Sequence, residues 1–394
     1  MKKILILNVG SSSCKFQLFT SDLELLGKGL IDRIGIENTS FEYQDSKGKK
    51  ISKKDFFLHK DLGIKLQEFI EDNKICDFND LYLMVHRIVM GAELFPQNII
   101  VKDFKIIEKI ESLTPLAPLH QPYNVIALKK FFKTHQEIKH VAVFDTTFHS
   151  TIPEKNFIFP IPHQFYKEYK IRRYGAHGTS HQYITEQVKK ILQKEEVTFI
   201  NFHLGNGASA CLIKDSKSYD TSMGLTPLGG LMMGTRSGDL DPSIAFYLIN
   251  QKKLSAIEVE NIFIKKSGLL GVYGKSPDMR DVILGEKKGD KRAILAREIF
   301  TKRINDYLAI YLNEVKKIDA ICFTGGIGEN DHDLIRKVFK NFNLRKINLI
   351  DEFNRNLEIA LISKKDSEIP IYIIKTNEEL QMAKIAQHLL AKDK

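Results

Sequence analysis

Short apolar runs alternate along the chain with longer amphipathic stretches. A run of four to six apolar residues with polar flanks is the pattern of a buried β-strand. Five such runs lie at residues 4–7, 141–144, 199–202, 320–323 and 369–374. Residues 293–315 contain no Gly or Pro and predict a long helix, and residues 380–390 predict a closing helix. Because strands alternate with helices, the pattern predicts an α/β fold.

Two distant segments, residues 4–19 and 198–213, form a faint internal repeat. Each contains an apolar strand, a tight turn of Gly, Asn and Ser, and a second apolar strand. The backbone N–H groups of such a turn can bind an anion, although the same residues also form ordinary hairpin turns. A buried strand that ends in small polar residues follows each hairpin, at residues 141–147 and 320–326. The pair of hairpins predicts a duplicated fold, with its two turns facing each other across a cleft.

Composition and charge narrow the class of function. The chain has 394 residues, of which 43% are hydrophobic and 27% charged, so we expect two or three globular domains of about 150 residues each. Lys and Arg number 59 and Asp and Glu 49, and the resulting net charge of +10 favours an anionic partner. The densest basic run, residues 47–54, lacks the aromatic and arginine side chains of a single-strand-binding groove. We interpret it as a solvated loop and expect no nucleic-acid partner.

Cysteine spacing and the shortness of the apolar runs indicate a cytoplasmic protein. The four cysteines are far apart and form no CxxC pair, which excludes a zinc ribbon and a thioredoxin-type site. A disulfide framework is not expected in so long a chain. The first apolar run is shorter than a signal peptide needs, and no apolar run is long enough to span a bilayer, so we expect no membrane partner.

A loop at residues 220–242 contains five glycines and two prolines, so it cannot form one long helix or strand. Loops of this length usually bind something or are flexible. Arg236 is its single arginine and has small neighbours, and a guanidinium suits a phosphate or a carboxylate. The alternative is an ion pair of Arg236 with Asp239 or Asp241 that only holds the shape of the loop.

Residues 172–181 place His177 between two glycines, on a tight turn. His177 and His181 are four residues apart, as in a helical zinc pair, but the Glu of the HExxH motif is missing and Gly178 lies between them. We therefore prefer an interpretation in which His177 donates a hydrogen bond to a developing phosphoryl charge.

Other chemical candidates lie where predicted strands end. Arg87 could hold a carboxylate at two points, and Asp145 lies where α/β folds place metal-binding or catalytic groups. Residues 323–330 run from a strand into a Gly-rich turn, which matches neither the Rossmann fingerprint nor the P-loop. The backbone of this turn could still pack against the flat base of a nucleotide or against a phosphate. Residues 376–379 have the spacing of a capping box with the first residue as N-cap, which leaves Glu378 as a magnesium ligand or a solvated acid.

Nine segments together resemble the acetate kinase family. They occur in the order of that family's motifs and span nearly the whole chain, at residues 7–16, 86–89, 116–120, 143–146, 173–181, 203–207, 220–242, 278–280 and 326–330. The resemblance implies an α/β, actin-like ATPase fold, a duplicated ribonuclease-H-like unit with two domains around a central cleft. It implies an N-terminal domain at residues 1–148, onto which residues 380–394 pack back, and a nucleotide-binding domain at residues 149–379.

The resemblance also implies roles for individual residues. The catalytic positions are Asp145, His177 and Arg236. The substrate-binding positions are Arg87, Val89, Leu119, His120 and Pro227. The ATP contacts are Lys15, His203, Leu204, Gly205, Asn206, Gly207, Asp278, Met279, Arg280, Gly326, Ile327, Gly328, Glu329 and Asn330. The magnesium positions, which Mn²⁺ can also occupy, are Asn8 and Glu378.

The reaction that the resemblance implies is a reversible, direct in-line transfer of the γ-phosphoryl group of ATP to acetate, which gives acetyl phosphate and ADP, and the family implies a homodimer. A carboxylate is already ionised at neutral pH, so positioning and positive charge matter more than a general base. We therefore expect Asp145 to orient magnesium-bound water or Arg236. The alternative of another class is an actin-like ATPase switch or filament protein, which would need no carboxylate-binding Arg87.

Three positions depart from the family's pattern. Ala176 stands where the family usually has Phe, whose ring helps to enclose the acetate methyl group. Without that ring, several more methylenes fit, each favourable by about 0.8 kcal/mol when buried, so a propionate or butyrate kinase is the nearest alternative. Met90 replaces a usual His and Gly229 a usual Glu, with no consequence that we can derive.

Overall fold

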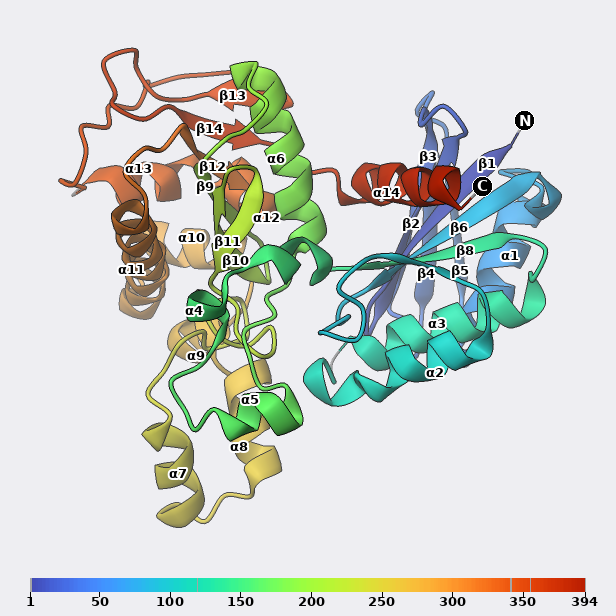
Figure 1. Ribbon diagram of the computed structural model, residues 1–394, viewed down its shortest axis with the longest axis horizontal. Helices are drawn as coiled ribbons and strands as arrows, with labels where there is room; N and C mark the ends of the chain where they lie inside the picture. The colour runs from blue at the N-terminus through green and yellow to red at the C-terminus, as the bar shows by residue number, and fades with distance from the viewer. Residues whose placement is uncertain (1, 119, 341, 355, 394) are drawn as a thin grey trace. The chain divides into compact units, whose positions relative to one another are not determined.

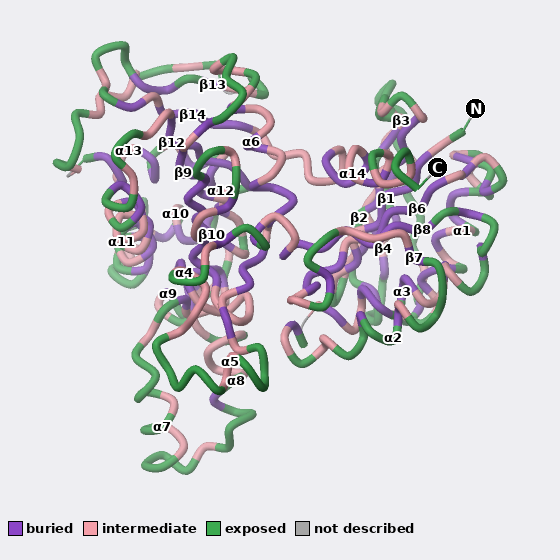
Figure 2. The backbone as a smooth tube through the Cα atoms, viewed as in Figure 1, coloured by how far each residue is buried: buried purple, intermediate pink, exposed green. Residues whose placement is uncertain are grey.

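The computed structural model describes residues 2–118, 120–340, 342–354 and 356–393. It divides into two compact units, which we call unit 1 (Met1–Ser150 and Asn377–Lys394) and unit 2 (Thr151–Thr376). Each unit contains one mixed β-sheet with helices on its faces (Figure 1). The buried residues concentrate in the sheets (Figure 2). Within the described residues, no helix is both long and apolar enough to cross a membrane.

Unit 1 is built on an eight-stranded sheet in the order β5-β4-β3-β2-β1-β6-β8-β7. Its strands are β1 (Lys3–Val9), β2 (Ser13–Thr20), β3 (Leu25–Asp32), β4 (Thr39–Asp45), β5 (Lys50–Asp55), β6 (Leu81–Ile88), β7 (Ile99–Val101) and β8 (Lys139–Phe144). Strand β6 runs parallel to both β1 and β8, whereas β1 to β5 form an antiparallel meander. The carboxyl ends of β1, β6 and β8 therefore meet at one edge of the sheet.

Different helices cover the two faces of this sheet. Helices α1 (Leu62–Asp72) and α3 (Gln121–Thr134) pack on one face through residues such as Leu66 and Phe131. Helix α14 (Glu378–Lys392) packs on the other through Met382 and Ala383. Helix α2 (Phe104–Ser112) lies beside α3 (Figure 1). Since a fully buried Leu or Phe side chain contributes about 1.5–3 kcal/mol, these contacts fix both faces of the sheet.

The interpretation of residues 47–54 as a loop was wrong in part. Residues Lys50–Asp55 form β5, the edge strand, which pairs only with β4. The backbone N–H groups of Lys47 and Lys49 donate to Asp45 Oδ1 at 2.9 and 2.8 Å and close the turn between the two strands. An edge strand needs one neighbour only, and its lysines discourage pairing with a second chain.

The predicted capping box at residues 376–379 was also wrong. Helix α14 begins at Glu378, and the cap is Asn377, whose Oδ1 accepts the backbone N–H of Leu380 at 3.0 Å. Thr and Asn both serve as N-caps, so the sequence pattern alone could not decide which of two adjacent residues caps the helix.

Unit 2 is built on a six-stranded sheet in the order β11-β10-β9-β12-β14-β13. Its strands are β9 (Phe199–Leu204), β10 (Ala208–Lys214), β11 (Lys217–Thr221), β12 (Ala320–Thr324), β13 (Ile359–Leu361) and β14 (Ile371–Ile374). Its helices are α4 (Glu154–Phe157), α5 (Gln164–Tyr169), α6 (Gly178–Leu192), α7 (Ser243–Asn250), α8 (Ala256–Lys265), α9 (Gly268–Tyr273), α10 (Met279–Lys287), α11 (Lys291–Glu314), α12 (Gly325–Asn330) and α13 (His332–Lys340).

Helix α11, predicted as a long helix, supplies much of the core of unit 2. Phe300, Ile304 and Leu308 on α11 are fully buried in one cluster with Ile321 and Phe323 of β12. Helix α6 lies on one side of the sheet, and α10, α11 and α13 lie on the other (Figure 1). The sheet is therefore covered on both faces, as its continuous apolar strands require.

The two sheets repeat one topology. The order β3-β2-β1-β6-β8-β7 in unit 1 corresponds to β11-β10-β9-β12-β14-β13 in unit 2, with the same parallel and antiparallel neighbours throughout. This confirms the predicted duplicated α/β fold. The strand at residues 320–326 nevertheless corresponds to β6 rather than to residues 141–147, because order along the chain does not show which strand lies next to the hairpin.

Candidate active site

Three predicted residues meet at the carboxyl edge of the unit 1 sheet. Asn8 lies near the end of β1, Arg87 near the end of β6, and Asp145 directly after β8. Arg87 donates from Nε to Asp145 Oδ1 at 3.0 Å and from Nη2 to Asp145 Oδ2 at 2.6 Å, and from Nη1 to Asn8 Oδ1 at 3.0 Å. Burial alone would lower the pKa of Arg87, but the charge of Asp145 more than offsets this effect, so the pKa is raised. The guanidinium is therefore held rigidly and stays charged.

The Arg87 fork that we expected to hold a substrate carboxylate is thus partly occupied. A guanidinium has five N–H groups, and Asp145 and Asn8 accept from three of them. Two N–H groups, one on each Nη atom, have no acceptor among the described residues. An Arg of this kind can orient an incoming carboxylate with its remaining donors, while Asp145 fixes the plane of the guanidinium.

Helix α3 holds the backbone beside Arg87 through two polar residues that the sequence did not single out. Asn124 accepts from Val89 N at 3.1 Å and donates to Val9 O at 2.6 Å, so it joins the ends of β1 and β6. Gln121 accepts from Met90 N at 3.1 Å and donates to Met90 O at 3.0 Å. Both side chains are buried, three residues apart on the inner face of the helix. Their spacing places both on one face of the helix, but the sequence alone does not show that this face is buried.

Two other predicted substrate positions lie at the start of α3. His120 is the residue before the helix, and its side chain makes no capping hydrogen bond there. Leu119 lies outside the described residues. Val89 is buried directly after β6, with 4% of its surface exposed. Val89 is thus two residues after Arg87, and His120 directly precedes Gln121, whose side chain binds the backbone of Met90.

The acidic start of α14 lies at the same sheet. Burial, and then the charge of Glu378, raise the pKa of Glu379. This corner therefore favours a cation. The amide oxygen of Asn8 and the carboxylate of Glu378 are hard oxygen donors of the kind that Mg²⁺ prefers, and Mg²⁺ commonly takes its other ligands from water and phosphate. The predicted magnesium residues of unit 1 thus fit such an ion.

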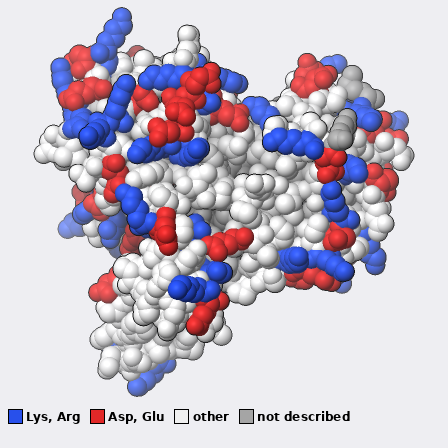
Figure 3. All heavy atoms as spheres, in the orientation of Figure 1, with Lys and Arg blue, Asp and Glu red and all other residues white. Residues whose placement is uncertain are grey.

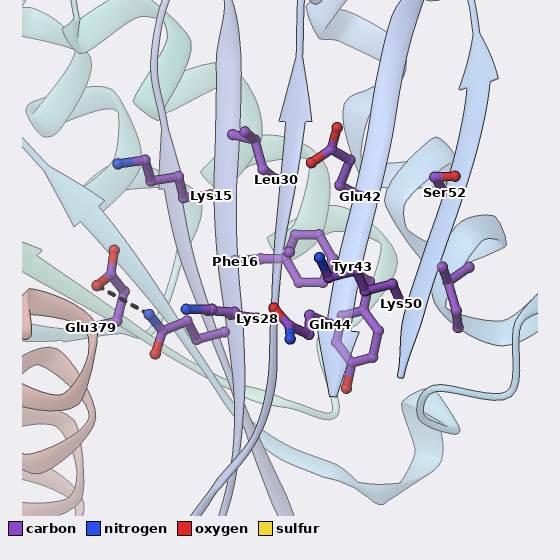
Figure 4. Close-up of a pocket in the computed structure, with 13 residues that line it drawn as sticks. Lys15, Phe16, Lys28, Leu30, Glu42, Tyr43, Gln44, Lys50, Ser52 and Glu379 are labelled. Atoms are coloured by element: carbon purple, nitrogen blue, oxygen red, sulfur yellow. Dashed lines mark hydrogen bonds between the residues drawn. The ribbon is translucent and has the colours of Figure 1, made fainter. Parts of the chain in front are cut away.

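A hollow opens on the sheet face beside this acidic corner (Figure 4). Strands β2 to β5 form its floor, and Glu379 closes one end. Gln17 Nε2 donates to Glu379 Oε2 at 3.3 Å. Lys15, a predicted ATP contact, is exposed on β2 opposite Asn8 and lines the same end of the hollow. Lys15 therefore adds positive charge next to the two acids of α14.

In unit 2, His177 is held by a chain of buried polar side chains. Its backbone is left-handed (φ 57°), directly before α6. Ser209 Oγ lies 2.9 Å from His177 Nδ1 and 2.9 Å from His181 Nε2, and Asn201 Nδ2 lies 2.8 Å from His181 Nδ1. Both ring nitrogens of His181 thus face side-chain partners, which argues against the zinc pair. With Nδ1 fixed by Ser209, the Nε2 edge of His177 points toward Gly207.

His177 and Arg236 come together over Gly207. A Cβ atom added at Gly207 would lie 2.8 Å from Arg236 Nη2 and 3.3 Å from His177 Nε2, so a larger residue there would displace the Arg236 guanidinium. Arg236 Nη1 donates to Pro227 O at 2.7 Å, which joins two predicted positions of the same loop. Two side chains able to donate to an anion therefore converge on one glycine backbone.

The Gly-rich loop is closed by Asp239. Asp239 accepts from Gly230 N at 2.7 Å through Oδ1, its own N–H donates to Gly230 O at 2.8 Å, and its Oδ2 accepts from Tyr307 on α11. Asp241 accepts from Ser243 N at 2.8 Å and so begins α7. The two aspartates that we considered as partners of Arg236 thus shape the loop through other groups.

Other predicted ATP contacts lie at the ends of β9 and β12. The ring of His203 lies beside that of His177, tilted by 37° with 4.4 Å between centroids, and its Nδ1 lies 2.8 Å from Ser180 Oγ. Glu329 turns inward: its Oε1 accepts from Gly325 N at 2.8 Å and from Thr376 N at 3.0 Å. This carboxylate therefore ties β12 to the segment after β14.

Glycine is required at Gly325 by the fold, but no contact with the described residues requires it at Gly326. Gly325 has φ +79°, and a Cβ there would meet Leu204 O at 2.8 Å, so the fold itself requires glycine. An added Cβ at Gly326 meets no described protein atom within 4 Å. The backbone at Gly326 is thus open for a ligand to approach, and the short helix α12 replaces the turn that we predicted here.

The segment at the start of α10 is only partly exposed. Asp278 caps α10 by accepting from Arg280 N at 2.8 Å, and Arg280 Nη2 donates back to Asp278 Oδ2 at 2.5 Å. Met279 is buried in the core of unit 2, with 4% of its surface exposed. Leu204 is likewise buried. Neither side chain is therefore exposed to a nucleotide in this structure.

The duplicated sheets and the polar groups at their strand ends define a kinase of the actin-like ATPase fold. Residues 3–384 match the model of the acetokinase family. Because the match spans nearly the whole chain, the protein belongs to the acetokinase family. It is a kinase with ATP as co-substrate, as that family implies.

Individual relatives are similar over the same length. Acetate kinases of Finegoldia magna and Halothermothrix orenii are each 41% identical, over 386 and 390 residues, which is 97% of this chain and 98% of each relative. A solved propionate kinase from Francisella tularensis is 40% identical with a TM-score of 0.93, and Porphyromonas gingivalis acetate kinase is 33% identical with a TM-score of 0.90. Both alignments cover 99% of this chain and all of the other.

Proposed function

We propose that this protein catalyses the reversible, Mg²⁺-dependent transfer of the γ-phosphoryl group of ATP to acetate, which gives acetyl phosphate and ADP by direct in-line transfer. The observation that carries this proposal is the Arg87 guanidinium, which Asp145 and Asn8 fix at the edge of the unit 1 sheet. An actin-like ATPase that acts as a switch or filament needs no such carboxylate-binding group.

The chemistry follows from charge. Acetate is ionised at neutral pH and must approach an anionic phosphoryl group, so the protein has to orient the acid and supply positive charge. Arg87 would orient the carboxylate, while His177 and Arg236, which converge on Gly207, would donate to the oxygens of the transferred group. Bound Mg²⁺, held through Asn8 and Glu378, would neutralise phosphate charge. Asp145 would act by orienting Arg87 rather than by accepting a proton.

A hydroxylamine assay tests this function directly. Purified protein with acetate, ATP and magnesium should form acetyl hydroxamate as acetyl phosphate is trapped. A switch ATPase would release phosphate from ATP without forming hydroxamate, and that result would reject the proposal. Omitting acetate is the control, because hydroxamate must then disappear while any hydrolysis of ATP persists.

One observation favours a longer acid as an alternative substrate. Ala176, where the family usually has Phe, offers only a methyl group, and a propionate kinase is among the similar solved structures. Comparing kcat/KM for acetate, propionate and butyrate decides between these acids. A preference for acetate above about tenfold would reject the alternative, and Ala176→Phe should then change the ratios little. If propionate wins, the same variant should restore acetate preference.

We also propose that the protein is a homodimer and that α7 and α8 contribute to its interface. Ile257, Phe246 and Tyr247 expose 70%, 63% and 55% of their surface, and α7 contains no charged residue, so the surface there is mostly white in Figure 3. Light scattering after size exclusion should give twice the chain mass for the wild type and less for Ile257→Asp. The matched control is Ile310→Asp, an exposed isoleucine on α11, which should leave the mass unchanged.

We also propose the two-domain organisation with boundaries after residues 148 and 379, which the division of the chain after Ser150 and Thr376 supports. A cytoplasmic location and the absence of nucleic-acid and membrane partners stay predictions from the sequence.

A further inference from the structure

Helix α11 carries two polar side chains that contact different segments of unit 2. Arg297 lies near its start and Tyr307 near its end. We propose that both are positioning residues: Arg297 holds the two ATP-contact segments at α10 and α12, and Tyr307 holds the loop that carries Arg236. This inference rests on the proposed function and goes beyond it, because it assigns separable roles to two residues of one helix that are not among the predicted site residues.

Arg297 is the centre of a buried ionic cluster. Its side chain is 3% exposed. It donates to Glu286 on α10, to Asp331 Oδ1 at 2.7 Å, and from Nη1 to Asp333 Oδ2 at 3.0 Å. Lys337 on α13 adds a second cation by pairing with Glu286. A single guanidinium thus joins three elements of the fold.

Two of the three acidic partners of Arg297 belong to, or directly follow, an element with predicted ATP contacts. Glu286 lies in the last turn of α10, whose N-cap is Asp278. Asp331 directly follows α12: its N–H donates to Ile327 O at 2.8 Å, and its Oδ1 accepts from Leu334 N at 3.0 Å, where α13 begins. Without Arg297, the buried Asp331 carboxylate would lose its main cation, so the corner between α12 and α13 must shift.

Tyr307 acts on a different segment. Its hydroxyl donates to Asp239 Oδ2 and lies 3.5 Å from Ser222 O. Asp239 in turn closes the Gly-rich loop on Gly230, and the stretch between these two residues carries Arg236. Burial, and then the charge of Asp239, raise the pKa of Tyr307, so its hydroxyl keeps its proton and remains a donor.

The two residues are ten positions apart on one helix, which is about 15 Å at 1.5 Å per residue. A change at either one should therefore alter different kinetic constants. Loss of Arg297 should weaken nucleotide binding, which raises KM for ATP. Loss of the Tyr307 hydroxyl should misplace Arg236, which lowers kcat. A merely structural role for α11 would instead lower stability and move both constants together.

The test compares Arg297→Met, Arg297→Lys and Tyr307→Phe with the control Lys302→Met, which removes an exposed pair with Asp306 on the same helix. Arg297→Met should raise KM for ATP about tenfold and weaken ADP binding by calorimetry equally, with KM for acetate within about twofold. Tyr307→Phe should lower kcat about fivefold with ADP affinity unchanged. Lys302→Met should match the wild type in each constant.

The outcomes separate the inference from the proposed function. If Arg297→Met does not fold, Arg297→Lys, which keeps the charge but loses the fork, carries the same expectation with a smaller shift. Unchanged ADP affinity in the folded Arg297 variants, or equal changes of KM and kcat in the Arg297 and Tyr307 variants, overturns the inference. Failure of the wild type to form hydroxamate rejects the function instead, and calorimetry with ADP still decides the role of Arg297.

Discussion

The two sheets share one topology but place different chemistry at the same edge. In unit 1, the strand ends carry charged and amide side chains, and Arg87, Asp145 and Asn8 satisfy one another there. In unit 2, the strand ends carry glycines, and side chains reach them from elsewhere in the unit, as Arg236 reaches Gly207. The comparison teaches that the same sheet topology can present fixed charged side chains in one unit and accessible backbone in the other. Substitutions in the two units should therefore impair activity in different ways.

The largest effect is expected where unit 1 loses its fixed charge. Arg87→Met should lower kcat/KM for acetate by about 10³, because it removes the carboxylate's orienting group and leaves Asp145 buried without its cation. Steady-state kinetics with varied acetate measure this. Arg87→Lys should recover only part of the loss, since an ammonium cannot replace a fork. Full activity of Arg87→Lys would mean that charge alone suffices.

The corresponding substitution in unit 2 adds a methyl group instead of removing a charge. Gly207→Ala should lower kcat about 10²-fold, because the new Cβ would lie 2.8 Å from Arg236 Nη2. The control is Gly326→Ala, whose Cβ meets no described protein atom within 4 Å, so its stability should match the wild type and only KM for ATP should rise. Equal loss of kcat in both variants would show that crowding at Gly207 is not the cause.

Asp145→Asn should have a smaller effect than loss of Arg87. The substitution keeps the shape of the side chain but places an amide N–H₂ against a guanidinium, so Arg87 loses its orientation. We expect kcat/KM for acetate at saturating magnesium to fall more than about tenfold, mainly through KM, with the pH dependence of kcat unchanged. Retention of more than about a tenth of the wild-type value would argue against this role, and a changed pH profile would indicate a general base.

The smallest effects concern stability, and acid should act on the two units with opposite signs. In unit 1, burial lowers the pKa of His140 to about 4 and, with the charge of His140, that of His86 well below its usual value. Their folded pKa values lie below the unfolded value of 6.5, so stability is full above that pH and falls as pH drops toward 4. In unit 2, burial raises the pKa of Asp220 from 3.8 to about 6 although Arg173 opposes this. That group disfavours folding as pH rises through 6.

Hydrogen exchange at several pH values measures the two units separately. Between neutral pH and about pH 5, peptides of unit 1 should lose protection, and His140→Gln should reduce that loss. Asp220→Asn should stabilise unit 2 by about 1 kcal/mol at neutral pH and by less in acid. If both variants respond to pH as the wild type does, His140 and Asp220 do not cause the difference in acid stability between the two units.

The sequence could locate the reactive residues of unit 1 one at a time, but not their mutual contacts. Asn8, Arg87 and Asp145 each follow an apolar run, whereas their ion pair and hydrogen bond depend on the register of β1, β6 and β8, which pairs segments far apart in the chain. The duplicated fold was predictable because the two hairpins share a local pattern. The place of the next strand was not, since strand order is a property of the sheet.

The sequence was least informative on the residues that position the site without being predicted members of it. Gln121 and Asn124 on α3, and Arg297 and Tyr307 on α11, are polar residues in helices, where polar positions usually face solvent. Nothing in their local pattern separates them from surface residues, because their partners come from loops that are distant in sequence. Only the folded positions of those loops show that these four side chains point inward.

The return of α14 to unit 1 bears on how the protein is made. The chain must pass through all of unit 2 before it supplies Met382, Ala383 and Ala386, which cover Ile4 and Val85 on the sheet of unit 1. During synthesis on the ribosome, an apolar sheet face made at the beginning therefore waits for a helix made near the end. That interval makes the nascent first half a natural client for chaperones, whereas unit 2 is continuous and can close as soon as its own residues have emerged.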